Sequence, residues 1–149
     1  MAAKLLNDDI VRQVKDLFDS QLVNPVEMVF FTTSEHCDTC QDTHQILTEV
    51  SAISEKIHLQ EYDLDKNPQL AQVYNVEMTP YLVITGTEGD DQLDYGLRFA
   101  GIPSGYEFTS LIQAILLVSK RDSGLSSQIR EELKGITHPI NLKVFVTPT

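Results

Sequence analysis

Val26-Glu27-Met28-Val29-Phe30-Phe31-Thr32-Thr33-Ser34-Glu35-His36-Cys37-Asp38-Thr39-Cys40 is the stretch that decides the fold. Residues 26–33 form an apolar run whose centre is apolar at successive positions, which predicts a central strand covered by helices on both faces. Residues 42–53 then carry apolar side chains at helical spacing. Cys37 and Cys40, the only two cysteines of the 149 residues, stand where the strand gives way to the helix.

This spacing of the two cysteines indicates dithiol–disulfide chemistry. We expect Cys37 at the N-terminus of the helix, where unpaired N–H groups and the helix macrodipole stabilise a thiolate. Cys40 follows about one helical turn later, close enough to attack a mixed disulfide formed on Cys37. A redox-active pair is therefore the leading interpretation.

The composition excludes several other classes of protein. An apolar fraction of 42% with 22% charged residues is ordinary for a globular chain. The formal net charge of −11 argues against nucleic acid and anionic membranes as partners. Asn7-Asp8-Asp9 interrupts the N-terminus before a signal peptide could develop, and no later run is long enough to span a membrane. We therefore expect a cytoplasmic location.

The hydrophobic pattern on either side of the opening stretch predicts alternating helices and strands. In chain order these are a helix capped by Asp8 or Asp9 and ending at Asn24-Pro25, the strand 26–33, a helix from the cysteines to about Ser54, a strand 57–64, a short helix 69–74, a strand 81–85, a turn 86–91, a strand 95–100 and a helix 107–120. The order is β-α-β-α-β-β-α behind one leading helix, which is an α/β arrangement.

The C-terminal residues repeat the pattern of the beginning. After a linker, Ser126 or Ser127 can cap a helix through Lys134, and residues 140–147 predict one more apolar strand. Residues 144–149 align with residues 29–34, and both follow a proline and an amphipathic helix. We expect a first domain over residues 1–121, and a linker plus the start of a second, truncated unit over residues 122–149.

The alternative is a C-terminal strand that simply caps the sheet. In either case the apolar tail strand needs cover, so we expect it to add to an edge of the sheet or to pair with a second copy in a homodimer.

Nearly the whole chain resembles the N-terminal unit of the two-domain protein disulfide oxidoreductases, a glutaredoxin-like family with the thioredoxin fold. The matching segments are 29–32 before Cys37-Asp38-Thr39-Cys40, 62–65 with 70–76, Met78-Thr79-Pro80, 95–108 and 144–149. The resemblance implies a thioredoxin-like fold with a central mixed four-stranded sheet flanked by helices, an extra N-terminal helix and a C-terminal helix–strand tail.

The resemblance also implies roles for particular residues. Cys37 would be the exposed nucleophile and Cys40 the buried resolving thiol of a thiol–disulfide oxidoreductase. Pro80 would follow a cis peptide bond, although an ordinary trans proline at the start of a strand is the alternative. Thr79 would then bind an extended substrate segment, in a groove that Gly101 and Ile102 complete. The implied partners are protein or small-molecule disulfides and an unidentified thiol reductant system, without an organic cofactor.

The chain departs from thioredoxin at two positions. His36 replaces the tryptophan that precedes the first cysteine, and Phe31 occupies the position of the buried acid that assists the second thiol. Deprotonation of Cys40 then relies on water or on another acid such as Asp63 or Asp65. Those two carboxylates are more typical of caps on the helix that follows them.

Two further interpretations compete with the redox pair. His36, Cys37, Cys40 and His44 offer a Cys2His2 set of metal ligands, but structural zinc sites usually join two separated ligand pairs, so we expect no metal site. A non-catalytic interaction module could instead use the groove to hold a partner without turnover.

Overall fold

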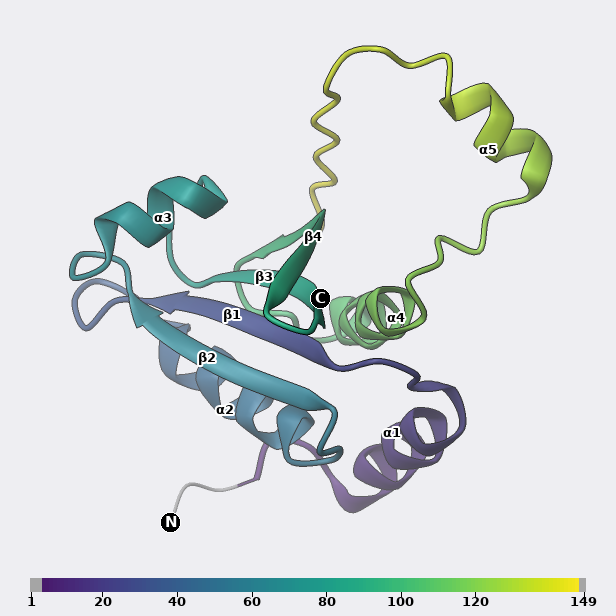
Figure 1. Ribbon diagram of the computed structural model, residues 1–149. Coiled ribbons are helices and arrows are strands. Elements are labelled where there is room, and N and C mark those ends of the chain that lie inside the picture. The colour runs from purple at the N-terminus through teal and green to yellow at the C-terminus, as the bar shows by residue number, and fades with distance from the viewer. Residues whose placement is uncertain (1–3, 148–149) are drawn as a thin grey trace.

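A mixed four-stranded sheet in the order β2-β1-β3-β4 organises the computed structural model, which describes residues 4–147 (Figure 1). The elements are α1 (Asp8–Gln21), β1 (Val26–Thr32), α2 (Cys40–Ser51), β2 (Ile57–Asp63), α3 (Pro68–Tyr74), β3 (Tyr81–Glu88), β4 (Asp91–Ala100), α4 (Tyr106–Lys120) and α5 (Ser127–Leu133). Strand β1 pairs in parallel with β2 and antiparallel with β3, which pairs antiparallel with β4. The predicted fold class is confirmed.

The hairpin between β3 and β4 is tighter than the sequence predicted. Both strands continue until only Gly89 and Asp90 remain between them. The register shifts between Ile84 and Thr85, whose partners on β4 are Leu97 and Asp94. The bulge on β4 thus interrupts the apolar alternation, and this irregularity concealed the first half of the strand.

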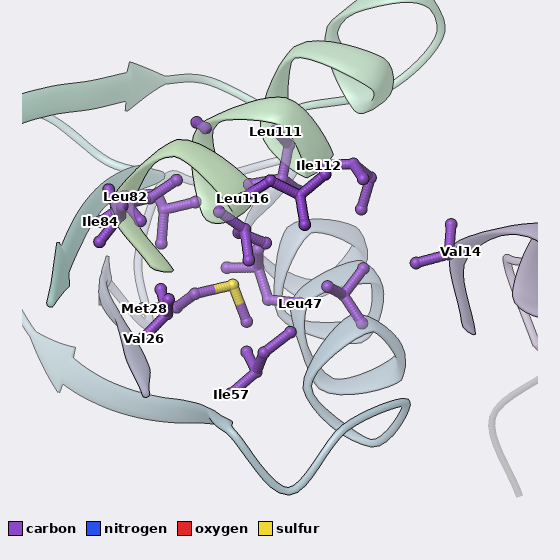
Figure 2. Packing of buried hydrophobic residues seen from close by; sticks show 14 of the residues in the cluster. Val14, Val26, Met28, Leu47, Ile57, Leu82, Ile84, Leu111, Ile112 and Leu116 are labelled. Carbon is purple, nitrogen blue, oxygen red and sulfur yellow. The ribbon is translucent and has the colours of Figure 1, made fainter. Parts of the chain in front are cut away.

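Strand β1 is buried on both faces, as its uninterrupted apolar run predicted. Met28 and Phe30 face a core built with α1, α2 and α4, whereas Val29 and Phe31 face a second, smaller core beneath α3. In Figure 2, Met28 lies among labelled core residues of α2, β2 and α4, which are Leu47, Ile57 and Leu116. Helices on both sides therefore fix this strand as the centre of the molecule.

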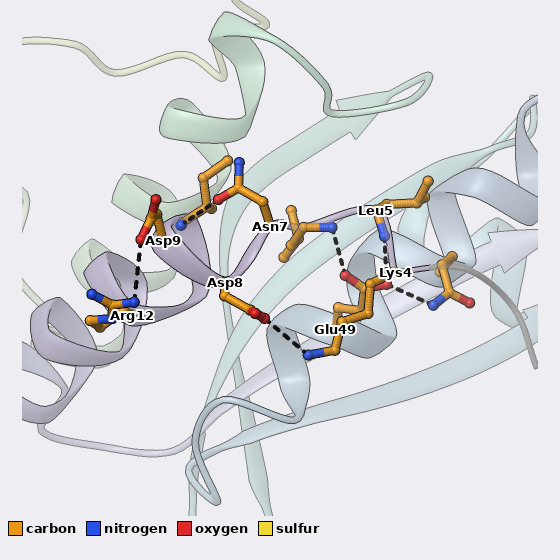
Figure 3. Close-up of polar contacts among 10 residues, drawn as sticks. Lys4, Leu5, Asn7, Asp8, Asp9, Arg12 and Glu49 are labelled. Atoms are coloured by element: carbon orange, nitrogen blue, oxygen red, sulfur yellow. Dashed lines mark hydrogen bonds and ion pairs between the residues drawn. The ribbon is translucent and has the colours of Figure 1, made fainter.

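The first helix is capped by a different residue from the two expected. Asn7 has an extended backbone, and its side-chain oxygen accepts a hydrogen bond from the Ile10 amide (Figure 3). Asp8 and Asp9 instead lie inside the first turn, where their charges favour the positive end of the helix macrodipole. The observed cap lies one residue before the first predicted one, because the side chain that reaches the amide of the third helical residue is that of Asn7.

The segment before α1 is fixed to α2 by one carboxylate. Glu49 accepts hydrogen bonds from the amides of Leu5 and Leu6, at 2.9 and 2.8 Å, and from the Gln45 side chain at 2.7 Å (Figure 3). Partial burial raises the pKa of Glu49, but these hydrogen bonds together outweigh it and hold the pKa below its ordinary value. The clamp places Leu6 in the core, where it is 6% exposed.

The C-terminal residues do not form the predicted strand. Helix α5 begins as expected, with the Ser126 hydroxyl accepting from the Ile129 amide. Residues 140–147 carry no strand and join no edge of the sheet, so the expectation of an added edge strand is wrong. An apolar run becomes a strand only when its backbone groups meet another strand, and this segment, the yellow end of the chain in Figure 1, pairs with none of the four strands. Pro148 and Thr149, the last residues of the predicted repeat, lie outside the described residues.

Candidate active site

The ends of all four strands bring four loops to one edge of the sheet. Phe31, near the end of β1, pairs with Tyr62 near the end of β2 and with Tyr81 at the start of β3. Tyr81 in turn pairs with Ala100 at the end of β4. The loops 33–39, 64–67, 75–80 and 101–105 therefore lie along the same edge, and they contain all the predicted site residues except Cys40, which directly follows the first of them.

The two cysteines form a disulfide at this edge. Their Cα atoms are 5.5 Å apart. Cys40 is the first residue of α2 and is 5% exposed, whereas Cys37 is half-buried in the preceding loop. The helix begins three residues later than predicted because the Thr39 carbonyl accepts the first helical hydrogen bond, from the Thr43 amide at 2.9 Å. Solvent therefore reaches Cys37 more readily than Cys40.

The predicted substrate-binding residues lie on the loops 75–80 and 101–105. The Thr79–Pro80 peptide bond is cis, as the resemblance implied. The Pro80 carbonyl accepts a hydrogen bond from the Gly101 amide at 2.9 Å. Gly101 has φ +95°, a conformation that side chains rarely tolerate, which explains the glycine. Thr79 and Ile102 are half-buried beside this pair.

Neither Asp63 nor Asp65 caps the following helix, contrary to expectation. The Asp63 carboxylate accepts hydrogen bonds from the amides of Asp65 and Lys66, and Asp65 accepts one from the Thr33 hydroxyl. Partial burial raises the pKa of Asp63, but the Lys66 amide and ammonium and the Asp65 amide together lower it below its ordinary value. Both carboxylates are thus engaged by nearby loop groups. The loop conformation, which the sequence did not show, explains the error.

Phe31 fills the buried position where thioredoxin carries an acid. It is 0% exposed and packs against Tyr62 and Tyr74, with ring centroids 5.9 and 6.0 Å away. An apolar aromatic cluster therefore lies beneath this part of the site.

A histidine–glutamate pair flanks the site on the α2 side. His44 Nε2 lies 2.9 Å from Glu61 Oε2 on β2. Sequence reasoning considered His44 only as a metal ligand and missed Glu61. The alternation of β2 carried the signal, because it places Glu61 on the same face as Ile57 and Leu59, toward α2. Across residues 4–147, no group of three metal-ligating side chains comes together.

The sequence and this geometry place the chain in a known family. Residues 9–97 match the thioredoxin family model, and these cover more than half of the chain. The chain belongs to the thioredoxin family.

Particular relatives share more than this family domain. The F subunit of alkyl hydroperoxide reductase from Staphylococcus aureus (strain MRSA252) is 30% identical over 145 residues, which are 97% of this chain and 25% of that protein. A protein disulfide oxidoreductase from Aeropyrum pernix K1 superposes with a TM-score of 0.74 at 26% identity, over 87% of this chain and 54% of that one. The resemblance found from the sequence is thus confirmed.

A further solved structure shares the fold. The NTD_N/C domain of alkylhydroperoxide reductase AhpF from Enterococcus faecalis superposes with a TM-score of 0.75 at 24% identity, over 86% of this chain and 59% of that one. The present chain spans about a quarter of the length of the curated relatives it matches. Among the helices of the described residues, none is long and apolar enough to cross a membrane.

Proposed function

We propose that this chain is a thiol–disulfide oxidoreductase unit in which Cys37 is the nucleophile and Cys40 the resolving thiol. The observation that carries the proposal is the unequal access to the two sulfurs of one disulfide. Cys40 is 5% exposed, whereas Cys37 is half-buried in a loop. A substrate thiol or disulfide therefore meets Cys37 first, and Cys40 is placed to displace it.

Local electrostatics support Cys37 as the nucleophile. Cys37 precedes the first turn of α2, and the N-cap residue Thr39 makes no side-chain hydrogen bond to that turn. The first-turn amides thus keep their partial positive charge for a nearby anion, which favours a thiolate at Cys37.

Thr79, Pro80, Gly101 and Ile102 are proposed as the substrate-binding surface. The hydrogen bond between Gly101 and Pro80 joins their loops at the edge that carries the disulfide. An extended peptide could lie along Thr79 in the manner of an added strand. The proposed substrates are protein or small-molecule disulfides, and the electron donor is a thiol reductant of the cytoplasm.

The division into residues 1–121 and 122–149 is also a proposal. It is supported by the core, whose buried hydrophobic residues lie between Leu6 and Val118, and by the exposure of the residues described after Arg121. The C-terminal segment is proposed to begin a second unit or to join two copies in a homodimer. A second C-x-x-C encoded shortly after Thr149 would support the former, and a dimer in light scattering would support the latter.

The test of the proposed activity is reduction of insulin by dithiothreitol. The chain should accelerate it, and Cys37→Ser should return the rate to that of dithiothreitol alone. Ser127→Ala, which changes an equally small side chain on exposed α5, serves as the control. Cys40→Ser should instead accumulate a mixed disulfide on Cys37. Equal rates with the wild-type chain and Cys37→Ser would favour the non-catalytic interaction module.

A further inference from the structure

His44 lies on the same side of α2 as the resolving cysteine. It follows Cys40 by four residues within α2. Side chains four residues apart on a helix have Cβ atoms about 5–6 Å from each other, and helical side chains lean toward the N-terminus. His44, whose side chain is 48% exposed, therefore stands one helical turn from Cys40 on the same side of α2.

Two residues of the sheet, Glu61 and Phe30, lie next to the imidazole of His44. Phe30 on β1 and Glu61 on β2 are register partners, so their side chains share the face beneath α2. The Phe30 ring lies 6.5 Å from the His44 ring, centroid to centroid, and the Glu61 carboxylate lies 2.9 Å from Nε2. The Thr48 hydroxyl lies 3.5 Å from the same nitrogen. Within residues 4–147, Nδ1 of His44 has no hydrogen-bond partner.

This arrangement selects which nitrogen can accept a proton. The Glu61 carboxylate lies 2.9 Å from Nε2, and its negative charge favours the neutral tautomer with the proton on Nε2, so that Nδ1 carries the lone pair. In the Ser-His-Asp triad of serine proteases, a carboxylate likewise fixes the tautomer of the histidine that acts as the base. Nδ1 of His44 is thus free to accept a proton, one helical turn from Cys40.

The site needs such a base. Cys40 is 5% exposed, so water has poor access to its thiol. The acid position of thioredoxin holds Phe31, and Asp63 and Asp65 are engaged by loop groups. Water, Asp63 and Asp65 are thus all unsuited to act as this base.

We infer that His44, oriented by Glu61, accepts the proton of the Cys40 thiol when Cys40 resolves the mixed disulfide. This inference rests on the proposed function. Nδ1 takes the proton, and the Cys40 thiolate attacks Sγ of Cys37. The Cys37–Cys40 bond forms, the bond from Cys37 to the substrate sulfur breaks, and the substrate leaves as a thiolate that is then protonated. The two cysteines are oxidised by two electrons and the substrate disulfide is reduced to two thiols.

The elements packed against His44 place few other charged side chains near it. Strand β1 presents Phe30, and β2 presents Glu61 and, two residues further on the same face, Asp63, which Lys66 pairs at 3.3 Å. On α2 itself, Asp42 stands two residues away and so points to another side of the helix. The dominant partner of the imidazole is therefore Glu61.

The experiment follows both steps with dithiodipyridine, a neutral disulfide that this acidic chain does not repel. The fully reduced chain is mixed with a limiting amount of the reagent in a stopped-flow instrument. The first thiopyridone is released when Cys37 attacks, and the second when Cys40 resolves the mixed disulfide. Cys40→Ser identifies the first phase, because it cannot give the second.

His44→Gln should slow the second phase by roughly tenfold near neutral pH and leave the first unchanged, since general bases commonly contribute at least this much. The difference should shrink as the pH rises, because hydroxide then removes the thiol proton of Cys40 without the imidazole. Glu61→Gln should slow the same phase by a smaller factor. His58→Gln, an exposed histidine on the opposite face of β2, should change neither phase.

Free imidazole should restore part of the second phase in His44→Ala, which a purely structural role would not allow. Equal second phases in the wild-type chain and His44→Gln at every pH would overturn the inference while leaving the proposed function intact. Absence of the first phase in the wild-type chain would instead overturn the proposed function.

Discussion

Two segments of this chain share a sequence pattern, but one is a buried strand and the other is exposed and forms no strand. Val29, Phe30 and Phe31 are 1%, 0% and 0% exposed in the central strand. The aligned residues Val144, Phe145 and Val146 are 77%, 90% and 53% exposed and belong to no strand. An apolar run therefore does not determine a strand by itself.

The difference lies in what surrounds each segment. Strand β1 has a hydrogen-bonded strand on either side, and helices cover both of its faces. Residues 145–147 lie near the start of α4, where they line an open hollow of about 550 Å³ with Tyr106, Glu107 and Ser110. Burial on two faces and pairing on two edges supply the free energy that orders a strand, and these come from elsewhere in the chain.

The largest expected effect contrasts the two phenylalanines at corresponding positions. Phe30→Ala should lower the free energy of unfolding by about 3–5 kcal/mol, because it leaves a cavity in the core. Phe145→Ala should change it by less than about 0.5 kcal/mol. Urea unfolding of the two variants measures both values, and similar losses would show that the C-terminal segment is packed in solution.

Ser119 tests how α4 is attached to the entry of β1. Its hydroxyl is buried, accepts from the amides of Val23 and Asn24, and donates to the Asn24 carbonyl at 2.7 Å. Ser119→Ala should cost about 1–3 kcal/mol, because it leaves these backbone groups without their buried partner. Ser123→Ala in the exposed linker is the control and should be nearly neutral. Equal unfolding midpoints for the two variants would contradict this assignment.

Glu49 tests the clamp on the N-terminal segment through its pH dependence. Because its pKa is lowered in the folded state, its contribution is complete above the ordinary pKa of about 4.3 and is lost as the pH falls through the lowered value. Glu49→Gln should cost about 1 kcal/mol near neutral pH and nothing at strongly acidic pH. Urea unfolding of this variant and of the wild-type chain across that pH range measures the difference.

Glu132→Gln is the matched control for the clamp. Glu132 also accepts from a glutamine four residues earlier, Gln128, but it lies on exposed α5 and receives no hydrogen bond from the N-terminal amides. A pH-independent difference between Glu49→Gln and the wild-type chain would contradict the clamp.

The smallest expected effect concerns cleavage of the C-terminal segment. Trypsin should cut first after Arg130, Lys134 or Lys143, where the chain is exposed. The remaining fragment should keep its free energy of unfolding within about 0.5 kcal/mol. Early cleavage before Lys120, or a large loss of stability, would erase the distinction between the two regions.

Most of the fold could be predicted because local pattern and tertiary structure agree over the first 121 residues. The double-sided apolar run, the helical stripes and the cysteines at their junction all indicated one arrangement. The wrong predictions concern polar side chains with several possible hydrogen-bond partners. At the first helix, for example, the cap is Asn7 rather than Asp8. In the same way, Asp63 bonds its own loop rather than the next helix. Short polar side chains satisfy whichever amide the backbone brings nearest.

The sequence by itself determined that the chain is an α/β protein with a dithiol at a strand–helix junction, because periodicity and residue type are local properties. Only the tertiary structure decided that Glu61 meets His44, that Gly101 binds Pro80, and that the second apolar run remains outside the sheet. Each of these depends on residues distant in the chain, and the register of neighbouring strands determines whether they meet.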